Sequence, residues 1–279
     1  MVQTLDLQCQ KANIPYEIIC LDDASNPDFQ QVNSHLNELS PQIKYQYLST
    51  NIGRAKIRNQ LTRLASYDCL LFMDCDAKVG SEDYISNYLK MINEDSVICG
   101  GRIYSSSPPD NQELKLHWLY GKQREQLPAP VRQQQPYTSF MTNNFLIAKH
   151  LMLAHPFEET LIQYGHEDTL FGLALQQKKI AIQHIDNPLQ HIGLEQTSTF
   201  LHKQNQAIKN LIQLLDAGHP ISTKLIRTHQ RLRYWGLILL LKPFQKKIQQ
   251  LAYQQLLRGS EKLLWLDVWK LMVFLNFRN

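Results

Sequence analysis

Residues 69–76 read CLLFMDCD, a short apolar run that ends in two aspartates one residue apart. A run with so few polar residues is typical of a strand that is buried on both faces. The aspartates that follow place two carboxylates around one small volume, where their like charges repel each other. A bound Mg²⁺ or Mn²⁺ would remove this repulsion, because both ions prefer oxygen ligands. Alone, the Asp-x-Asp pattern is a weak motif, since Asp also forms turns.

Strand-length apolar runs alternate with helical patterns around this stretch. The predicted strands cover residues 16–21, 43–48, 69–73, 96–99 and 180–185. The predicted helices, with apolar residues three and four positions apart, cover residues 29–39, 54–65 and 84–92. This alternation favours an α/β domain whose mostly parallel sheet is flanked by helices. Ligands of such sheets bind beyond the carboxyl ends of the strands, which is where we expect the chemistry.

Two breaks interrupt this pattern. Residues 104–140 hold five of the 12 prolines, which is typical of either a disordered segment or a lid, and both alternatives stay open. The second break, DAGHP at residues 216–220, ends a helix that is predicted from Glu195. We therefore expect one domain over residues 1–216 that carries the chemistry and a helical tail over residues 217–279.

The composition excludes several classes of protein. Of the 279 residues, 43% are hydrophobic and 19% are charged, unlike a disordered, collagenous or coiled-coil chain. The five cysteines form no C-x-x-C pair, so neither a zinc ribbon nor a secreted disulfide framework is indicated. The first residues, MVQTLDLQCQK, predict no signal peptide. We expect a cytoplasmic protein.

Two further acidic pairs lie where apolar runs stop. Asp22 and Asp23 follow the run YEIICL, and Glu167 and Asp168 open a helical pattern. Taken singly, each pair is best explained by turn formation or helix capping, both of which Asp favours. In combination with the Asp-x-Asp motif, the pairs become more specific.

Four stretches, in order, resemble the signatures of a known family. They are YEIICLDDAS at 16–25, NIGRAKIRN at 51–59, LLFMDCDA at 70–77 and YGHEDT at 164–169. Their order and spacing resemble those of the family 2 glycosyltransferases, which have the GT-A fold, over roughly residues 5–210. The resemblance implies a transferase that uses a nucleoside diphosphate sugar.

The resemblance also implies roles for the first acidic residues. In the family, the carboxylate pair after the second strand holds the nucleotide base and ribose, which implies donor binding by Asp23 and by Asp22. The Asp-x-Asp motif holds the metal and the diphosphate of the donor. Asp74 and Asp76 are therefore the expected metal ligands, and Asp74 is also expected to contact the donor.

The family's catalytic base is the Asp of the later acidic pair, a role that the resemblance implies for Asp168. Its neighbour Glu167 is expected to contact the acceptor or the sugar. His191 comes after the last predicted strand, where related transferases often supply a further metal ligand. A structural role for His191 is an equal alternative, because histidine also caps and packs.

Two other groups of residues are candidates for donor binding. Arg54 and Arg58 flank the start of a helix, where guanidinium groups and helix N-terminal amides bind phosphate; the alternative is an exposed helix face. Asn144 and its neighbour Asn143 resemble a family position near the donor sugar, and the alternative is a turn before a strand.

The sequence departs from the family pattern at its start. Members begin with a strand of the type VSVIIPxYN, whose end contacts the nucleotide base, whereas this sequence starts inside what corresponds to the following helix. A misassigned start, a fragment and a degenerate relative are the explanations that stay open.

The tail is strongly basic. Residues 219–279 have a net charge of +9, and the remainder of the chain has a net charge of −5. The apolar runs at 234–241 and 271–277 are shorter than the roughly 18–20 residues that span a bilayer. Residues 244–257 separate apolar from polar side chains, and Trp235, Trp265 and Trp269 lie nearby.

This composition predicts interfacial helices on an anionic membrane surface, which would place the protein peripherally on the inner face of the cell membrane. The alternative is that the helices pack on protein. We expect no nucleic-acid binding, because no recognition motif accompanies the charge.

These features predict an inverting, metal-dependent glycosyltransferase. We expect transfer from a nucleoside diphosphate donor, a UDP-sugar in the first instance, to a hydroxyl of a glycan or lipid-linked glycan, with Mg²⁺ or Mn²⁺ as cofactor. A nucleotidyltransferase usually needs a Gly-rich phosphate loop, which is not seen. The remaining alternative is a non-catalytic subunit that binds a nucleotide sugar or a partner enzyme.

Overall fold

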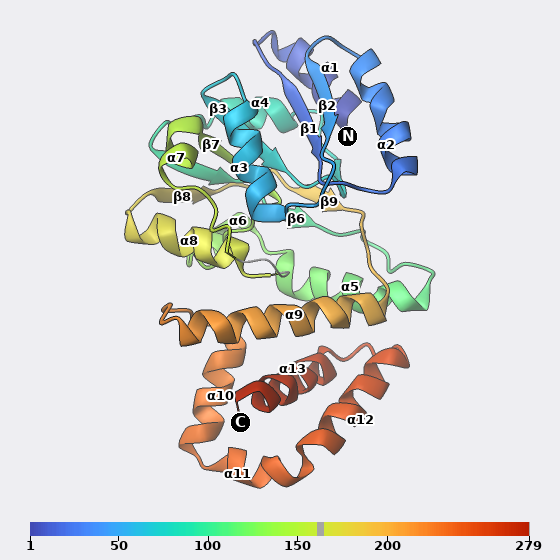
Figure 1. Cartoon of the computed structure of the whole chain (residues 1–279), viewed down its shortest axis with the longest axis vertical. Coiled ribbons are helices and arrows are strands. Elements are labelled where there is room, and N and C mark those ends of the chain that lie inside the picture. The colour runs from blue at the N-terminus through green and yellow to red at the C-terminus, as the bar shows by residue number, and fades with distance from the viewer. Residues whose placement is uncertain (161–164, 279) are drawn as a thin grey trace. The chain divides into compact units, whose positions relative to one another are not determined.

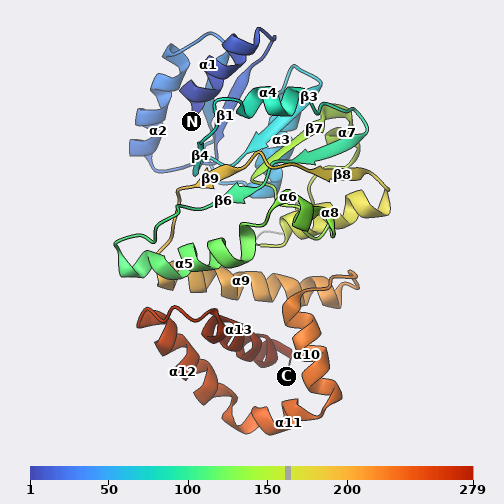
Figure 2. The same cartoon turned by 180° about the vertical axis from the view of Figure 1, so that it is seen from behind.

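The computed structural model describes residues 1–160 and 165–278, which form two compact units (Figures 1 and 2). Unit 1 comprises the described residues of Met1–Ile103, Gln126–Ile162 and Glu167–Gly193. Unit 2 comprises those of Tyr104–Glu125, Gln163–His166 and Leu194–Asn279.

Strands and helices alternate along unit 1, which confirms the α/β class. The strands are β1 (Ile18–Asp22), β2 (Ile43–Tyr47), β3 (Cys69–Met73), β4 (Ala77–Val79), β5 (Ser96–Cys99), β6 (Arg102–Ile103), β7 (Asn144–Ala148), β8 (Ala181–His184) and β9 (Leu189–His191). The helices are α1 (Val2–Ala12), α2 (Pro27–Ser34), η1 (His35–Glu38), α3 (Arg54–Leu64), α4 (Tyr84–Leu89), α6 (Ala129–Gln133), α7 (Lys149–Ala154) and α8 (Glu167–Gln177).

Within the described residues, the strands form sheets in the orders β1-β2, β3-β7-β5-β8 and β4-β9-β6. The pairs β1–β2, β5–β8 and β6–β9 are parallel, whereas β3–β7, β5–β7 and β4–β9 are antiparallel. The sheets are therefore more mixed than predicted, because β7 enters between β3 and β5 in the opposite direction. In this register Met73 lies opposite Asn144, at the end of β3 where the Asp-x-Asp motif begins.

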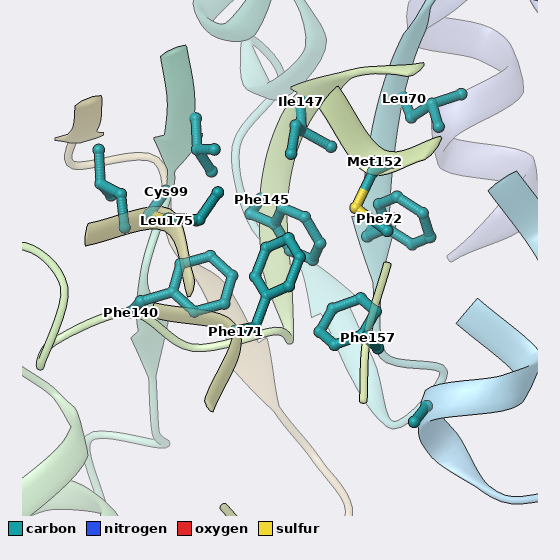
Figure 3. Close-up of a cluster of buried hydrophobic side chains, with 13 residues drawn as sticks. Leu70, Phe72, Cys99, Phe140, Phe145, Ile147, Met152, Phe157, Phe171 and Leu175 are labelled. Atoms are coloured by element: carbon teal, nitrogen blue, oxygen red, sulfur yellow. The ribbon is translucent and has the colours of Figure 1, made fainter. Parts of the chain in front are cut away.

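Stacked aromatic rings fill the core beside the four-stranded sheet (Figure 3). Phe72 of β3 and Phe145 of β7 lie opposite each other, with ring centroids 4.9 Å apart. Phe171 of α8 stacks on Phe157 at 4.3 Å. Burial of such rings is a large source of stabilisation. Strand β3 and helix α8 therefore pack into the same core.

Unit 2 consists of helices. They are η2 (Gln112–Leu114), α5 (Lys115–Tyr120), η3 (Gly121–Glu125), α9 (Thr197–Asp216), α10 (Lys224–Tyr234), α11 (Leu237–Leu241), η4 (Lys242–Phe244), α12 (Gln245–Leu257) and α13 (Leu263–Arg278). Residues 104–140 contain several of the chain's helices and divide between the units, so the alternative of disorder does not apply.

Helix α9 belongs to unit 2, whereas the sequence grouped it with the first domain and predicted a boundary after residue 216. The helix packs against α13, and Lys270 of α13 donates a hydrogen bond to Gln204 of α9 at 2.7 Å. Leu201 and Ile208 of α9 are buried.

The apolar face predicted over residues 244–257 lies partly inside unit 2. Helix α12 packs along α13, so Ala252 and Leu256 are fully buried, and Trp269 is only 4% exposed. For these side chains the packing alternative is correct, and they cannot meet a membrane. None of the described helices combines the length and the apolar character that a membrane span requires.

Candidate active site

Asp74 lies directly after β3, between two arginines. Its backbone N–H donates to the carbonyl of Asn143, the residue before β7, so the β3–β7 pairing fixes its position. Arg58 of α3 donates to Asp74 Oδ1 at 2.8 Å, and Arg102 of β6 lies 3.4 Å from Oδ2. Such charge-assisted contacts are stronger than neutral ones. The cluster carries one positive charge in excess, which suits an anionic ligand.

Asp76 lies beside His191 of β9. Ala77 pairs with His191 in the β4–β9 register, and this pairing places Asp76 Oδ1 3.4 Å from His191 Nδ1. Asp76 Oδ1 is buried, and no described donor forms a hydrogen bond with it. Burial raises the pKa of the Asp76 carboxyl. His191 and neighbouring arginines lower it by a larger amount, so the pKa lies below its ordinary value. Asp76 is therefore ionised at neutral pH.

A divalent cation was expected at Asp74, Asp76 and His191. Asp76 and His191 fit this expectation, because a buried oxygen without a hydrogen bond lies next to an imidazole. Asp74 does not fit in this arrangement, since each of its oxygens faces a guanidinium group. Within residues 1–160 and 165–278, no three or more His, Cys, Asp or Glu side chains group as a metal site. The described part of the site thus offers two candidate ligands, and a Mg²⁺ or Mn²⁺ shell also takes water and phosphate oxygens.

Asp22 and Asp23 hold the loops that follow β1 and β2. Asp22 accepts hydrogen bonds from the Tyr45 hydroxyl at 2.8 Å and from the Ser25 backbone at 2.7 Å. Burial raises the pKa of Asp22, but hydrogen bonds from the Ser25 hydroxyl, the Ser25 backbone and Tyr45 outweigh it and leave the pKa below its ordinary value. Asp23 accepts from two successive backbone N–H groups just before α3, at 2.6 and 2.9 Å. Binding of base and ribose by this pair stays a prediction.

The start of α3 directs two arginines to the carboxylates. Gly53 precedes the helix with φ 86°, a left-handed conformation that favours glycine. Arg54 Nη1 lies 3.6 Å from Oε1 of Glu167, the first residue of α8. Arg58 is buried, and its Nη1 has no hydrogen-bond acceptor among the described residues. Arg58 therefore does not lie on an exposed helix face, the alternative that the sequence left open.

Asp168 is the second residue of α8. Its Oδ1 accepts a hydrogen bond from the backbone N–H of Thr169 at 2.7 Å, in the manner of a helix cap. Tyr164 of the predicted motif lies outside the described residues. The catalytic role of Asp168 and the acceptor contact of Glu167 stay predictions.

The side chain of Asn144 makes four hydrogen bonds in the interior, and the residue is 1% exposed. Its Oδ1 accepts from the hydroxyls of Tyr84 and Tyr88, both at 2.6 Å, and its Nδ2 donates to the carbonyls of Gly101 and Asn187. A contact between Asn144 and a donor sugar would require some of these bonds to break. The Asn143 side-chain oxygen, by contrast, is buried without a hydrogen bond to any described residue.

Two residues of the site were missed by the sequence analysis. Arg102 follows the strand that ends at Cys99, so attention to basic as well as acidic residues at strand ends would have found it. Gly193 approaches Asp76 so closely that a Cβ atom at residue 193 would lie 2.7 Å from Asp76 Cβ. No sequence signal indicates that approach.

The sequence model described as "Glycosyl transferase family 2" matches residues 3–152, which is more than half of the chain. The chain belongs to this family. As a family 2 glycosyltransferase it is an enzyme of sugar transfer, as the four motifs predicted. The matched range includes the carboxylates from Asp22 to Asp76, and it ends before Glu167, Asp168 and His191.

Solved structures of other glycosyltransferases are similar to this one. The mannosyltransferase PcManGT from Pyrobaculum calidifontis, in complex with GDP-Man and Mn²⁺, has a TM-score of 0.47 and 14% identity, covering 95% of this chain and 84% of its own. GalNAc-T7 with UDP, GalNAc and Mn²⁺ has a TM-score of 0.43 and 15% identity, covering 64% of this chain and 37% of its own. No curated protein sequence matches the chain.

Proposed function

We propose that this family 2 glycosyltransferase moves a sugar from a nucleoside diphosphate donor to an acceptor hydroxyl, with inversion at the anomeric carbon. The observation that carries the proposal is the meeting of Asp74 with Arg58 and Arg102 next to the Asp76–His191 pair. Arg58 and Arg102 together exceed the charge of Asp74 by one, and the neighbouring Asp76 carboxylate would hold a cation, which is the chemistry that a diphosphate requires.

The proposed site holds the donor through charge. Arg58 and Arg102 would contact the diphosphate, with Asp74 orienting both guanidinium groups, while Asp22 and Asp23 lie at the nucleotide end. Asp76 and His191 would hold a Mg²⁺ or Mn²⁺ ion. Such an ion would neutralise the charge on the leaving diphosphate. Asp74 would join that ion only if one of its arginine contacts opened.

Asp168 is the proposed base. Its carboxylate takes the proton of the acceptor hydroxyl as the oxygen forms its bond to the anomeric carbon, and the bond to the diphosphate breaks on the opposite face. The ion pair of Glu167 with Arg54 links the start of α8 to the start of α3. We propose that this link positions Asp168 toward the donor cluster.

Calorimetric titration with UDP and with GDP, each with and without Mn²⁺, tests the donor site. The variant Asp76→Ala should lose the Mn²⁺-dependent part of the affinity, a decrease of about tenfold or more, because one of two protein ligands is absent. The exposed Asp95 of the same unit provides a matched control as Asp95→Ala. Equal Mn²⁺-dependent affinity in both variants would contradict the metal assignment.

The proposed acceptor is a glycan or a lipid-linked glycan, and the proposed location is the cytoplasm with a peripheral position on the inner face of the cell membrane. Support comes from the basic charge of unit 2, whose last 61 residues carry +9. A surface of this charge is attracted to anionic lipids. Binding of donor without any transfer to such acceptors would favour a non-catalytic subunit.

A further inference from the structure

An apolar tip of unit 2, residues 234–244, exposes large side chains to solvent. It consists of the end of α10, the turn at Gly236, α11 and η4. Leu239 and Leu240 are 76% and 69% exposed, and Tyr234, Trp235 and Phe244 are exposed to a similar degree. In both views of the molecule α11 lies at the end of unit 2 that is remote from α9 (Figures 1 and 2).

This exposure does not come from a failure of α11 to pack. Ile238 and Leu241 turn inward and contact a cluster that contains Leu271 and Met272 of α13. Residues three positions apart share one face of a helix, so Leu239 and Leu240 must point to the opposite side. The helix is thus anchored by one face and presents a second apolar face outward. Solvent exposure of such a face is unfavourable unless another surface covers it.

The charged residues that flank the apolar tip along the chain are all basic. Residues 217–260 contain eight Lys and Arg and no Asp or Glu. Arg231 and Arg233 on one side of the tip and Lys242, Lys246 and Lys247 on the other are exposed. A second copy of the chain is disfavoured as the covering partner, because it would bring two cationic surfaces together. Nucleic acid would match the charge but not the leucines.

We infer that the apolar tip is the surface by which the protein docks on anionic lipid membranes. Trp235 and Tyr234 are residue types that favour the headgroup level, Leu239, Leu240 and Phe244 would enter the acyl boundary, and the flanking lysines and arginines would meet lipid phosphates. This docking rests on the membrane-surface part of the proposed function. The apolar tip, and not the buried face of α12, is therefore the part of unit 2 that would contact the membrane.

Vesicle co-sedimentation of the full chain tests the inference. The probes are phosphatidylcholine vesicles with and without phosphatidylglycerol, at low and high salt. The tip variant Trp235→Ser/Leu239→Ser/Leu240→Ser should bind the anionic vesicles about tenfold or more weakly at either salt concentration, because its apolar contacts are lost. The charge variant Lys242→Gln/Lys246→Gln/Lys247→Gln should lose mainly the part of the binding that salt weakens.

A matched control removes three exposed leucines elsewhere in unit 2, as Leu251→Ser/Leu257→Ser/Leu264→Ser. This control should bind as the parent does, and a loss equal to that of the tip variant would overturn the assignment to the tip. Parental binding by the tip variant would overturn it as well. A third outcome would also overturn it: the parent binds no vesicles but self-associates, and the tip substitutions abolish that self-association. Titration with UDP and Mn²⁺ is run on the same variants, and unchanged donor binding separates failure of docking from failure of the proposed reaction.

Discussion

Asp168 combines a local structural contact with the reactivity proposed for it, and a single substitution separates the two. In Asp168→Asn the side-chain oxygen still accepts the Thr169 N–H, so we expect α8 and the binding of donor to be preserved. An amide does not take up a proton, however, and transfer should fall by roughly two to four orders of magnitude. The measurement is the rate of sugar transfer, with UDP affinity as the companion readout.

The matched control for this prediction is Thr169→Val at the neighbouring position. It keeps the backbone N–H that Asp168 accepts and removes only the hydroxyl next to the Asp168 carboxylate. Its transfer rate should therefore stay close to that of the parent. Parental transfer by Asp168→Asn would show that Asp168 is only a cap and that the base lies elsewhere.

The residue scale also shows what sequence reasoning can and cannot supply. The four motifs were sufficient to predict the family, because their residue types and order are specific. The partners of those residues were not predicted, since Asp74 meets Arg102 only through strand pairings far apart in the sequence. The interior position of Asn144 likewise depends on two tyrosines of α4.

Among the elements, the short β4–β9 pair positions the metal candidates. Gly193 follows β9, and a methyl group there would lie 2.7 Å from Asp76 Cβ. We expect Gly193→Ala to displace Asp76 and to weaken Mn²⁺-dependent UDP binding about tenfold, because ligand geometry is exacting. Gly80→Ala is the control, since nothing lies within 4 Å of a Cβ atom at that glycine. Equal affinities in the two variants would show that the close approach is not needed for the site.

Elements differed in how well the sequence predicted them. The strands β3 and β5 have the predicted bounds, because each is an apolar run of strand length. The strands β4, β6 and β9, of two or three residues, were not predicted, since so few residues carry no periodicity. The face of α12 was detected, but its partner was not, because an apolar stripe has the same pattern whether it meets a helix or a lipid.

At the scale of the whole molecule, Lys270 links the stability of the chain to pH. Burial lowers its pKa to about 8, with Asp267 and Glu125 opposing the shift. In the unfolded chain a lysine titrates near 10.4, so between about pH 8 and 10.4 the unfolded state binds more protons. Stability therefore rises with pH across this window. Lys270→Met should remove about 2 kcal/mol of that rise.

The free energy of unfolding, measured with denaturant at several pH values between about 7 and 10, shows how much of this rise Lys270 causes. The exposed Lys262 supplies the control as Lys262→Met, which should keep the parental slope. A parental slope in Lys270→Met, or its loss in Lys262→Met, would contradict the assignment to Lys270.

The path of the chain between the units has a consequence for how this protein can change. The chain leaves unit 1 after Ile103, returns at Gln126, contributes the described residues of Gln163–His166 to unit 2, and leaves again at Leu194. Unit 2 is therefore assembled from internal segments as well as from the C-terminal helices. Truncation at the C-terminus therefore cannot remove unit 2 as a whole. Any rotation of one unit against the other would need backbone changes at several crossings together, which is a stricter condition than a one-stranded hinge imposes.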